Sequence, residues 1–243
     1  MKQRLDHALV SQKLVPSRSK ATDFIKRGFI LVNGSVVTEQ AHMVSSTDTI
    51  TTLNLPQYVS RGGEKLEHAL KIWNIDVSNI AALDIGSSTG GFTDCLLKHN
   101  ITSVACIDTG TDQLHQDIRN NTKVTVYENT DIRNFNIEKR FDIIVIDVSF
   151  ISLTHILPVL KKYTKTNTDI IALIKPQFEV GAENLNRKGI VKEGCDVSPV
   201  FEILKQAATQ EGFKTQDIIP SPIQGGDGNQ EYLWYIRSQF ACI

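Results

Sequence analysis

The sequence predicts a small N-terminal α+β domain followed by a larger α/β domain with a mainly parallel, doubly wound sheet. Three observations predict this organisation. Residues 1–30 carry seven lysines and arginines against two aspartates, although the whole chain has a net charge of −1. Residues 82–97 have the pattern of a strand, a glycine-rich turn and a helix start, which is the first crossover of a doubly wound sheet. The continuous apolar runs Ile143–Ile146 and Ile170–Ile174 are typical of buried parallel strands.

The composition is that of a globular protein, with 41% hydrophobic and 22% charged residues over 243 positions. The four cysteines have no C-x-x-C spacing, which argues against a zinc site and against a disulfide framework. The chain begins without the apolar stretch of a signal peptide, and no segment has the ~20 apolar residues of a membrane span. We therefore expect a cytoplasmic protein with no metal and no membrane partner.

The first 55 residues are expected to form two helices and a small sheet. Apolar residues recur at helical spacing over residues 4–14. Ser17 can cap a second helix, which Gly28 is suited to end. The Asn-Gly pair at 33–34 joins two β-rich runs and predicts a hairpin, and Thr49–Leu53 fits a further strand.

This first domain resembles an S4 RNA-binding domain. The stretch RLDHALVSQKLVPSRSKATDFIKRGFILVNGSVV follows that family's pattern of R-L-D-x-x-L, S-R-s-x-A and G-x-V-x-V-N-G, with Ile30 in place of the usual valine. The resemblance implies binding to structured RNA, mainly through phosphates, so the affinity should fall steeply with salt. The side chains expected to contact RNA are Arg4, Arg18, Lys20, Lys26 and Arg27.

Residues 56–60 are expected to link a first domain of residues 1–55 to a second domain of residues 61–243, because this stretch lacks periodicity and contains a proline. A helix is expected from Lys65 to Trp73. Lys65 would then stand at a helix start, where the helix dipole disfavours a cation. It is either a surface lysine or a residue with a task at the turn.

The glycine-rich turn has the pattern D-x-G-x-x-x-G-x-x-T, in which Asp84 ends the strand. A carboxylate at this place repels phosphate and suits a cationic or hydroxyl-rich ligand such as S-adenosylmethionine, which favours a methyltransferase. The alternative is a glycine turn in some other α/β domain. The next strand should end at Asp108, 22 residues after Gly86, where a carboxylate can bind ribose hydroxyls. Asp131 follows a third strand, Lys123–Tyr127, and is placed to reach an adenine edge.

Charged residues follow or precede the remaining strands. Asp147 and Lys175 come directly after the two apolar runs, and burial of a strand end with a charge is costly unless the charge has a partner. A helix is expected over Val197–Glu211, and the strands Thr215–Pro220 and Tyr232–Arg237 would close the sheet as a hairpin. The four charges expected on one rim are Lys65, Asp147, Lys175 and Glu231.

These four residues form either two structural ion pairs or a catalytic group for methyl transfer to a ribose 2′-hydroxyl. An alcohol is a poor nucleophile at neutral pH and needs a base or strong positioning. A lysine can act as that base if a second cation and partial burial lower its pKa. We expect Lys175 to lie nearest the hydroxyl, with Asp147 and Glu231 orienting the lysines.

Six further stretches resemble the haemolysin TlyA family, whose methyltransferase domain is of the FtsJ type: SRGGEKL, LDIGSSTGGFTDCLL, DIIVIDVSFISL, IALIKPQFEVG, GIVKEG and SPIQGGDGNQEYL. The resemblance covers essentially the whole chain. It implies a Rossmann-like, mainly parallel seven-stranded sheet with one antiparallel strand. It also implies S-adenosylmethionine-dependent 2′-O-methylation of ribosomal RNA, free or in a ribosomal subunit.

The family's Lys-Asp-Lys-Glu tetrad falls on the four rim residues named above. Its cofactor motifs fall on Asp84, Gly86, Gly90, Phe92, Thr93, Asp108 and Asp131. Position 131 departs from the family, because many members have asparagine in that stretch.

Other functions fit this sequence less well. An RNA base N-methyltransferase carries an N-P-P-Y-like loop after its fourth strand, whereas residues 147–150 begin with an acid and contain no proline. A base C5-methyltransferase needs a cysteine near that loop, and none is present. A pore-forming or membrane-active haemolysin is suggested by the family name alone. An RNA-binding module with a decayed enzyme domain is disfavoured because all four tetrad positions are filled.

Overall fold

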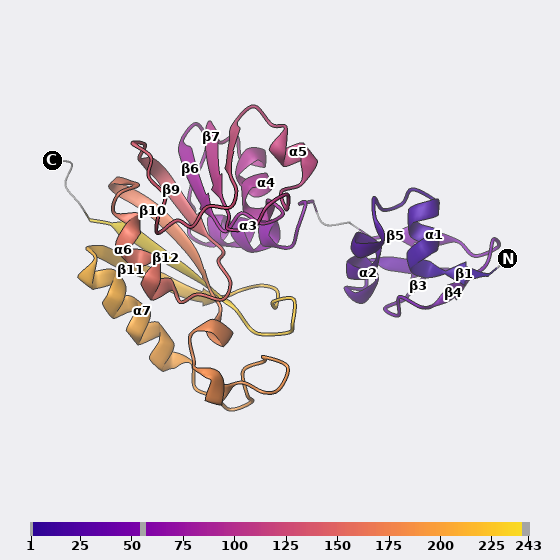
Figure 1. Ribbon diagram of the computed structural model, residues 1–243. Coiled ribbons are helices and arrows are strands. Elements are labelled where there is room, and N and C mark those ends of the chain that lie inside the picture. Colours follow the sequence, from indigo (N-terminus) through magenta and orange to yellow (C-terminus); the bar gives the residue numbers. More distant parts are fainter. Residues whose placement is uncertain (1, 54–56, 240–243) are drawn as a thin grey trace. The chain divides into compact units, whose positions relative to one another are not determined.

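The computed structural model of the chain describes residues 2–53 and 57–239 (Figure 1). The described residues of its first compact unit, Met1–Gln57, form two helices, a three-stranded sheet and a two-stranded sheet. The helices are α1 (Leu5–Ser11) and α2 (Arg18–Lys26). The strands are β1 (Gln3–Arg4), β2 (Ile30–Val32), β3 (Ser35–Val36), β4 (Met43–Val44) and β5 (Ile50–Thr52).

Local chemistry accounts for the ends of these elements. The Ser17 hydroxyl accepts a hydrogen bond from the Lys20 N–H and begins α2. Asn33 and Gly34 both have positive φ, as the tight turn between β2 and β3 requires. The first helix ends at Ser11, earlier than expected, because Lys13 adopts a left-handed conformation with φ of 58°. The two-residue strands β1 and β4 were not predicted, since such short pairs leave no periodic pattern.

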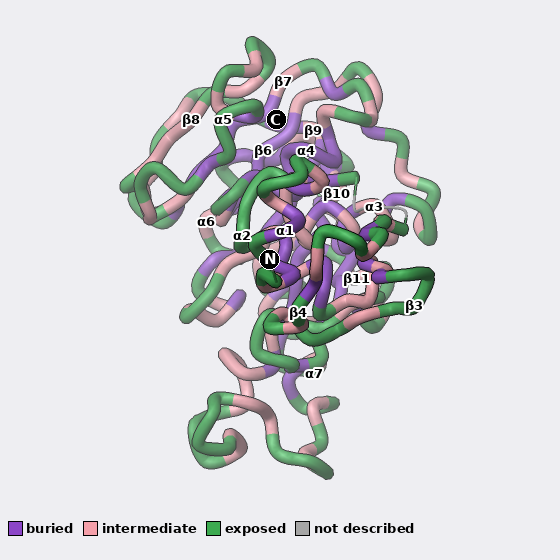
Figure 2. The backbone as a smooth tube through the Cα atoms, turned by 90° about the vertical axis from the view of Figure 1, so that its right-hand side faces the viewer, coloured by how far each residue is buried: buried purple, intermediate pink, exposed green. Residues whose placement is uncertain are grey.

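The core of this unit comes from the apolar faces of both helices and of the sheet (Figure 2). Its buried residues are Leu5, Ala8, Leu9, Val15, Ala21, Phe24, Ile25, Ile30, Val32, Val44 and Ile50. The predicted pair of helices and the hairpin are therefore confirmed.

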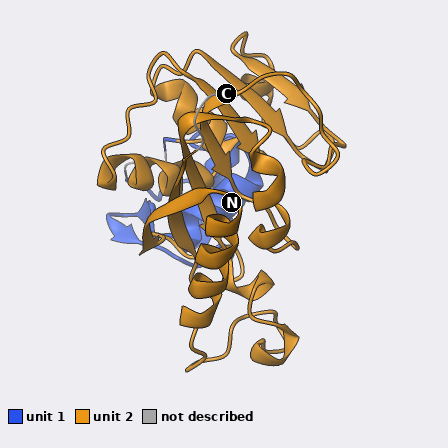
Figure 3. Ribbon diagram, turned by 90° about the vertical axis from the view of Figure 1, so that its left-hand side faces the viewer, with its two compact units in different colours: residues 1–57 blue, residues 58–243 orange. Residues whose placement is uncertain are grey.

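The second compact unit begins at Tyr58 (Figure 3). Tyr58 is buried, and the Val59 N–H donates a hydrogen bond to Asp94 at 2.7 Å. Residues 58–60, expected to belong to the linker, therefore pack on the second unit. Position 56 of that expected linker lies outside the described residues.

The second unit contains one seven-stranded sheet in the order β11-β12-β10-β9-β6-β7-β8. Among the described residues of this unit, β12 pairs antiparallel with β10 and β11, and the other strand pairs are parallel. This confirms the predicted mainly parallel sheet with one antiparallel strand. The strands are β6 (Ala81–Ile85), β7 (Ser103–Ile107), β8 (Val124–Tyr127), β9 (Phe141–Ile146), β10 (Thr164–Ile174), β11 (Phe213–Pro220) and β12 (Tyr232–Ser238).

Helices cover both faces of this sheet (Figure 1). Alternate residues of β6 show the two layers, because Ala82 packs with α3 and α4 whereas Leu83 and Ile85 pack with α6 and α7. Burial on both faces explains why the central strands are continuously apolar. The helices are α3 (Gly62–Ile72), α4 (Gly91–Lys98), α5 (Gln116–Arg119), α6 (Leu157–Leu160), α7 (Ser198–Gln210) and the 3₁₀ helices η1 (Leu153–His155), η2 (Pro176–Phe178) and η3 (Ala182–Asn184). Within the described ranges, no helix combines the length and apolar character that a membrane crossing requires.

The strand register brings distant charges to one edge of the sheet. Ile85 pairs with Ile146 across parallel strands, and Ile174 pairs with Tyr232 across antiparallel ones. The next positions along these strands therefore meet at the carboxyl edge of β6, β9 and β10. Those positions are Gly86, Asp147, Lys175 and Glu231.

Candidate active site

A pocket of about 680 Å³ opens at the carboxyl edge of β6, β7, β8 and β9. The chain runs from β6 outward to β7 and β8 and then crosses to β9 on the other side of β6. The pocket therefore lies at the topological switch point, where doubly wound sheets bind their ligands. Its lining includes Gly86, Asp108, Asp131, Arg133, Asp147, Ser149 and Phe150.

The glycine-rich turn passes unusually close to the neighbouring strand end. Gly86 has φ of +82°, and a Cβ at this position would lie 2.4 Å from the Asp147 carbonyl oxygen. Gly90 has φ of +90°, and a Cβ there would lie 2.9 Å from the Leu114 side chain. Both positions thus require glycine, but only the first contributes to the pocket lining given above.

Asp84 lies beneath this turn, and its side chain is fully buried. Its Oδ2 accepts a hydrogen bond of 2.6 Å from the Thr93 hydroxyl, whereas Oδ1 has no hydrogen-bond partner in the described part of the chain. Burial raises the pKa of Asp84 to about 7, although the hydrogen bond from Thr93 lowers it. Phe92 is also buried, and it packs beside Gly62.

The structure thus divides the seven predicted cofactor residues into two groups. Gly86, Asp108 and Asp131 line the pocket. The buried residues that support the turn are Asp84, Gly90, Phe92 and Thr93. The sequence motif did not separate these two groups.

Two carboxylates that line the pocket after β7 and β8, Asp108 and Asp131, are held in place by different donors. Asp108 accepts hydrogen bonds of 2.7 Å from the N–H groups of Ser88 and Gly110. Asp131 accepts hydrogen bonds from the Arg133 guanidinium, which lower the pKa of Asp131 below its usual value. Three aspartates against one arginine give the described lining a negative balance, which favours a ligand that carries positive charge.

Phe150 is a site feature that the sequence did not reveal. It lines the pocket, is 90% exposed and has φ of +63°, which is rare for a bulky residue. Its ring centroid lies 5.0 Å from that of Phe178, which follows Lys175 on η2. The pair presents an aromatic surface at the pocket mouth, suited to stacking with a base.

The four predicted tetrad residues form two ion pairs. Lys65 pairs with Glu231, and both are buried, with 6% and 3% of their surface exposed. Lys175 Nζ lies 2.7 Å from Asp147 Oδ1 and donates a hydrogen bond of 2.9 Å to the Ser149 hydroxyl. Since Asp147 and Ser149 line the pocket, the second pair borders the place where a ligand would bind.

Glu231 is enclosed by the turn that precedes β12. A Cβ at Gly225 would lie 2.5 Å from Glu231 Oε1, so a larger residue would push the turn away from the carboxylate. The Lys65–Glu231 pair therefore connects the first turn of α3 with the carboxyl end of β10 and the amino end of β12. The strand register places this pair next to Lys175, because Ile174 is opposite Tyr232.

The five predicted RNA-binding residues lie on the first unit, and several of them have partners there. Arg4 and Arg18 both hydrogen-bond to the buried carboxylate of Asp6, at 3.0 and 3.3 Å. Arg27 pairs with Asp23 and lies over the Phe29 ring. Arg4 and Arg18 still expose 42% and 60% of their side chains. Lys20 and Lys26 also lie on α2, and Lys26 is exposed.

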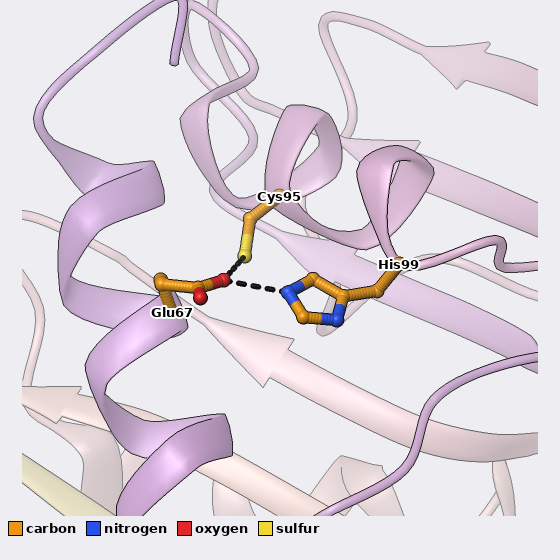
Figure 4. Close-up of side chains that lie close together, drawn as sticks. All are labelled: Glu67, Cys95 and His99. Carbon is orange, nitrogen blue, oxygen red and sulfur yellow. Dashed lines mark hydrogen bonds and ion pairs between the residues drawn. The ribbon is translucent and has the colours of Figure 1, made fainter. Parts of the chain in front are cut away.

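A second cluster of ionisable groups lies between α3 and α4. Figure 4 shows Glu67 of α3 facing Cys95 of α4 and His99, the residue that follows the last turn of α4. Such residues can bind a metal, but Glu67 already accepts hydrogen bonds from His99 at 2.6 Å and from Tyr58 at 2.9 Å. It also pairs with Lys71 at 2.8 Å. Burial raises the pKa of Glu67, but the hydrogen bonds from Lys71 and His99 outweigh this effect and lower the pKa to about 2. Protein donors therefore satisfy this carboxylate.

The sheet order, the switch-point pocket and its acidic lining define a Rossmann-like methyltransferase. Residues 58–238 match the FtsJ-like methyltransferase family, and residues 3–50 match the S4 domain. The chain therefore belongs to the FtsJ-like methyltransferase family and carries an N-terminal S4 domain.

Similar proteins align with nearly the whole chain. Hemolysin A of Brachyspira hyodysenteriae is 41% identical over 95% of this chain and 98% of its own length. The 16S/23S rRNA (cytidine-2′-O)-methyltransferase TlyA of Mycobacterium tuberculosis is 35% identical over 97% of this chain and 90% of its own. A solved structure of a hemolysin-named protein from Streptococcus thermophilus superimposes with a TM-score of 0.77 at 35% identity, covering 99% of this chain and 90% of its own.

Proposed function

We propose that this enzyme methylates a ribose 2′-hydroxyl in ribosomal RNA, with S-adenosylmethionine as the methyl donor. The observation that carries the proposal is the Lys175–Asp147 pair at the wall of the switch-point pocket, with the buried Lys65–Glu231 pair beside it. Relatives from Mycobacterium tuberculosis and Campylobacter jejuni are named rRNA (cytidine-2′-O)-methyltransferases, which supports the same reaction.

The pocket fits the proposed methyl donor. S-adenosylmethionine supplies a methyl group on a positively charged sulfur, and it also carries an amino group and ribose hydroxyls. The negative balance of the lining suits these charges, and Asp108 can accept hydrogen bonds from ribose hydroxyls. Asp131 would face the adenine, and Gly86 would let the donor approach the turn backbone. The unpaired Oδ1 of Asp84 is suited to accept a hydrogen bond from the amino group, directly or through water.

The tetrad supplies what an alcohol nucleophile needs. Lys175 would hold the 2′-hydroxyl by a hydrogen bond and receive its proton when the neutral amine is available. Asp147 and Ser149 fix the position of the Lys175 nitrogen, as the distances of 2.7 and 2.9 Å indicate. The Lys65–Glu231 pair lies next to Lys175 in the strand register and carries no net charge. Alignment of oxygen, methyl carbon and sulfur would supply much of the rate.

The S4 unit would bring the substrate to this site. Arg18, with Arg4, would bind phosphates of structured RNA while Asp6 holds both guanidinium groups in place. The substrate is ribosomal RNA, free or within a ribosomal subunit, and such a substrate is found in the cytoplasm.

A product analysis tests the proposal. The purified protein is incubated with ribosomal RNA or ribosomal subunits and with S-adenosylmethionine that carries a labelled methyl group. The RNA is then digested to nucleosides, and mass spectrometry separates labelled ribose from labelled bases. A 2′-O-methylated nucleoside is the expected product. A methylated base with an unmodified ribose would instead identify a base methyltransferase.

A further inference from the structure

The turn that ends at Glu231 is bordered by cations from two distant segments of the second unit. The first cation is Arg61, next to the start of α3. A Cβ at Gly226 would lie 3.3 Å from a guanidinium nitrogen of Arg61, so this side chain lies against the turn. Arg61 has no carboxylate partner among residues 2–53 and 57–239.

The second segment is the loop of residues 185–191, which Asn229 fixes to the same turn. The Asn229 side chain is buried and accepts a hydrogen bond of 2.9 Å from the Val191 N–H. It also donates a hydrogen bond of 3.1 Å to the Gly189 carbonyl oxygen. Since Asn229 lies two residues before Glu231, the loop is held beside the tetrad.

This loop presents two cations to solvent. Arg187 and Lys188 are exposed at its tip, and no carboxylate in the described ranges pairs with either of them. The Asn186 side chain accepts hydrogen bonds from the N–H groups of Lys188 and Ile190, at 2.8 and 3.1 Å. The tip therefore has a defined conformation, which reduces the entropy that a bound partner must remove.

We infer that Arg61, Arg187 and Lys188 form a phosphate-binding rim that holds the RNA backbone beside the target ribose. The inference rests on the proposed function of the neighbouring tetrad. An RNA strand that reaches this tetrad must pass the adjoining turn, and the two lysines of the tetrad are already paired with Asp147 and Glu231. The cations of the rim have no carboxylate partner in the described ranges and can therefore bind the phosphates, in any sequence, because they contact only the backbone.

Salt-dependent binding and turnover test the rim in the full-length protein. The variants are Arg187→Ala/Lys188→Ala, Arg61→Gln and, as a control, Lys214→Ala. Lys214 is an exposed lysine near the start of β11, at the end of that strand away from the turn. In the strand register it lies opposite Arg237 of β12. We measure KM and kcat for methyl transfer to ribosomal RNA, and binding of a fluorescent ribosomal RNA fragment by anisotropy at several salt concentrations.

Loss of two phosphate contacts should raise KM for RNA about 10-fold in the double variant and reduce the salt slope of log affinity by about 1.5. Arg61→Gln should reduce the slope by about half as much. The control Lys214→Ala should bind and methylate RNA as the wild type does. All variants should keep the wild-type affinity for S-adenosylhomocysteine. A salt slope that is the same in the wild type and in the double variant would overturn the rim. If the wild type transfers no methyl group to ribosomal RNA, the proposed function fails. The anisotropy titration still shows whether the rim residues bind RNA phosphates.

Discussion

Lys65 and Glu231 form a buried ion pair although 166 positions separate them in the sequence. Lys65 lies on the first turn of α3, and Glu231 lies where the antiparallel strand β12 begins. The pair therefore joins an element that precedes the sheet to the last strand that enters it. Both charges are out of water, so each depends on the other for compensation.

The first prediction concerns the stability of this pair. Lys65→Met leaves Glu231 buried without its partner and should lower the free energy of unfolding of the second unit by about 3 kcal/mol. The double variant Lys65→Met/Glu231→Gln should recover most of that loss, because no unpaired charge remains. Both tryptophans, Trp73 and Trp234, lie in the second unit, so fluorescence during urea unfolding reports on it alone. Equal destabilisation in the single and double variants would contradict this account.

The second prediction assigns the chemistry to Lys175. Lys175→Ala should lower the rate of methyl transfer by a factor of about 100 or more, because the hydroxyl loses its hydrogen-bonding partner and base. Binding of RNA and of S-adenosylhomocysteine should change little. Lys139→Ala is the control, since Lys139 hydrogen-bonds to Ser103 at the opposite edge of the sheet. Undiminished turnover of Lys175→Ala would remove this residue from the mechanism.

The sequence predicted those parts of the fold that local patterns determine. The run Ile143–Ile146 identified a buried strand because its residues are apolar on both faces, and the Asn33-Gly34 pair identified a hairpin because both residues must adopt positive φ. The charges at the strand ends also predicted that the tetrad residues lie at one edge of the sheet, because parallel strands end at the same edge.

Other features depend on packing that no local pattern contains. The pairing of Lys65 with Glu231 rather than with Asp147 follows from the position of β12 next to β10. The glycine motif did not reveal that Asp84 is buried beneath the turn, because its contact with Thr93 requires the start of α4 to fold back onto β6. The exposed Phe150 has a positive φ that its sequence does not indicate.

The third prediction concerns RNA binding by the first unit. Arg18→Gln should weaken binding of ribosomal RNA and reduce its salt dependence by about one phosphate contact. The neutral substitution is preferred to Arg18→Glu, which would place a second carboxylate beside the buried Asp6. Lys13→Gln, which changes an exposed lysine outside both helices, is the matched control. An RNA affinity of Arg18→Gln equal to that of the control would contradict the role of Arg18 in RNA binding.

The fourth prediction concerns pH. Burial raises the pKa of Asp84 to about 7, above its usual value of 3.8. The folded protein therefore retains this proton more strongly than the unfolded chain, and the resulting stabilisation is present below pH 4 and declines as the pH rises to 7. Asp84→Asn removes the contribution, so its Tm relative to the wild type should rise between pH 5 and pH 8. Tm is measured by tryptophan fluorescence at each pH. If Tm changes with pH in the same way in the wild type and in Asp84→Asn, Asp84 does not titrate in this way.

The fifth prediction separates steric fit from backbone strain at the glycine turn. Gly86→Ala places a Cβ 2.4 Å from the Asp147 carbonyl oxygen at a φ of +82°, whereas Gly189→Ala has a similar φ of +74° with nothing within 4 Å. Both variants carry the cost of a left-handed residue, about 1–2 kcal/mol. Only Gly86→Ala must also push the ends of β6 and β9 apart, which deforms the pocket wall. We expect it to be less stable than Gly189→Ala in urea and to bind S-adenosylhomocysteine at least 10-fold more weakly by calorimetry, about 1.4 kcal/mol. Equal stability and equal affinity in the two variants would show that the close approach of Gly86 to Asp147 does not shape the cofactor site.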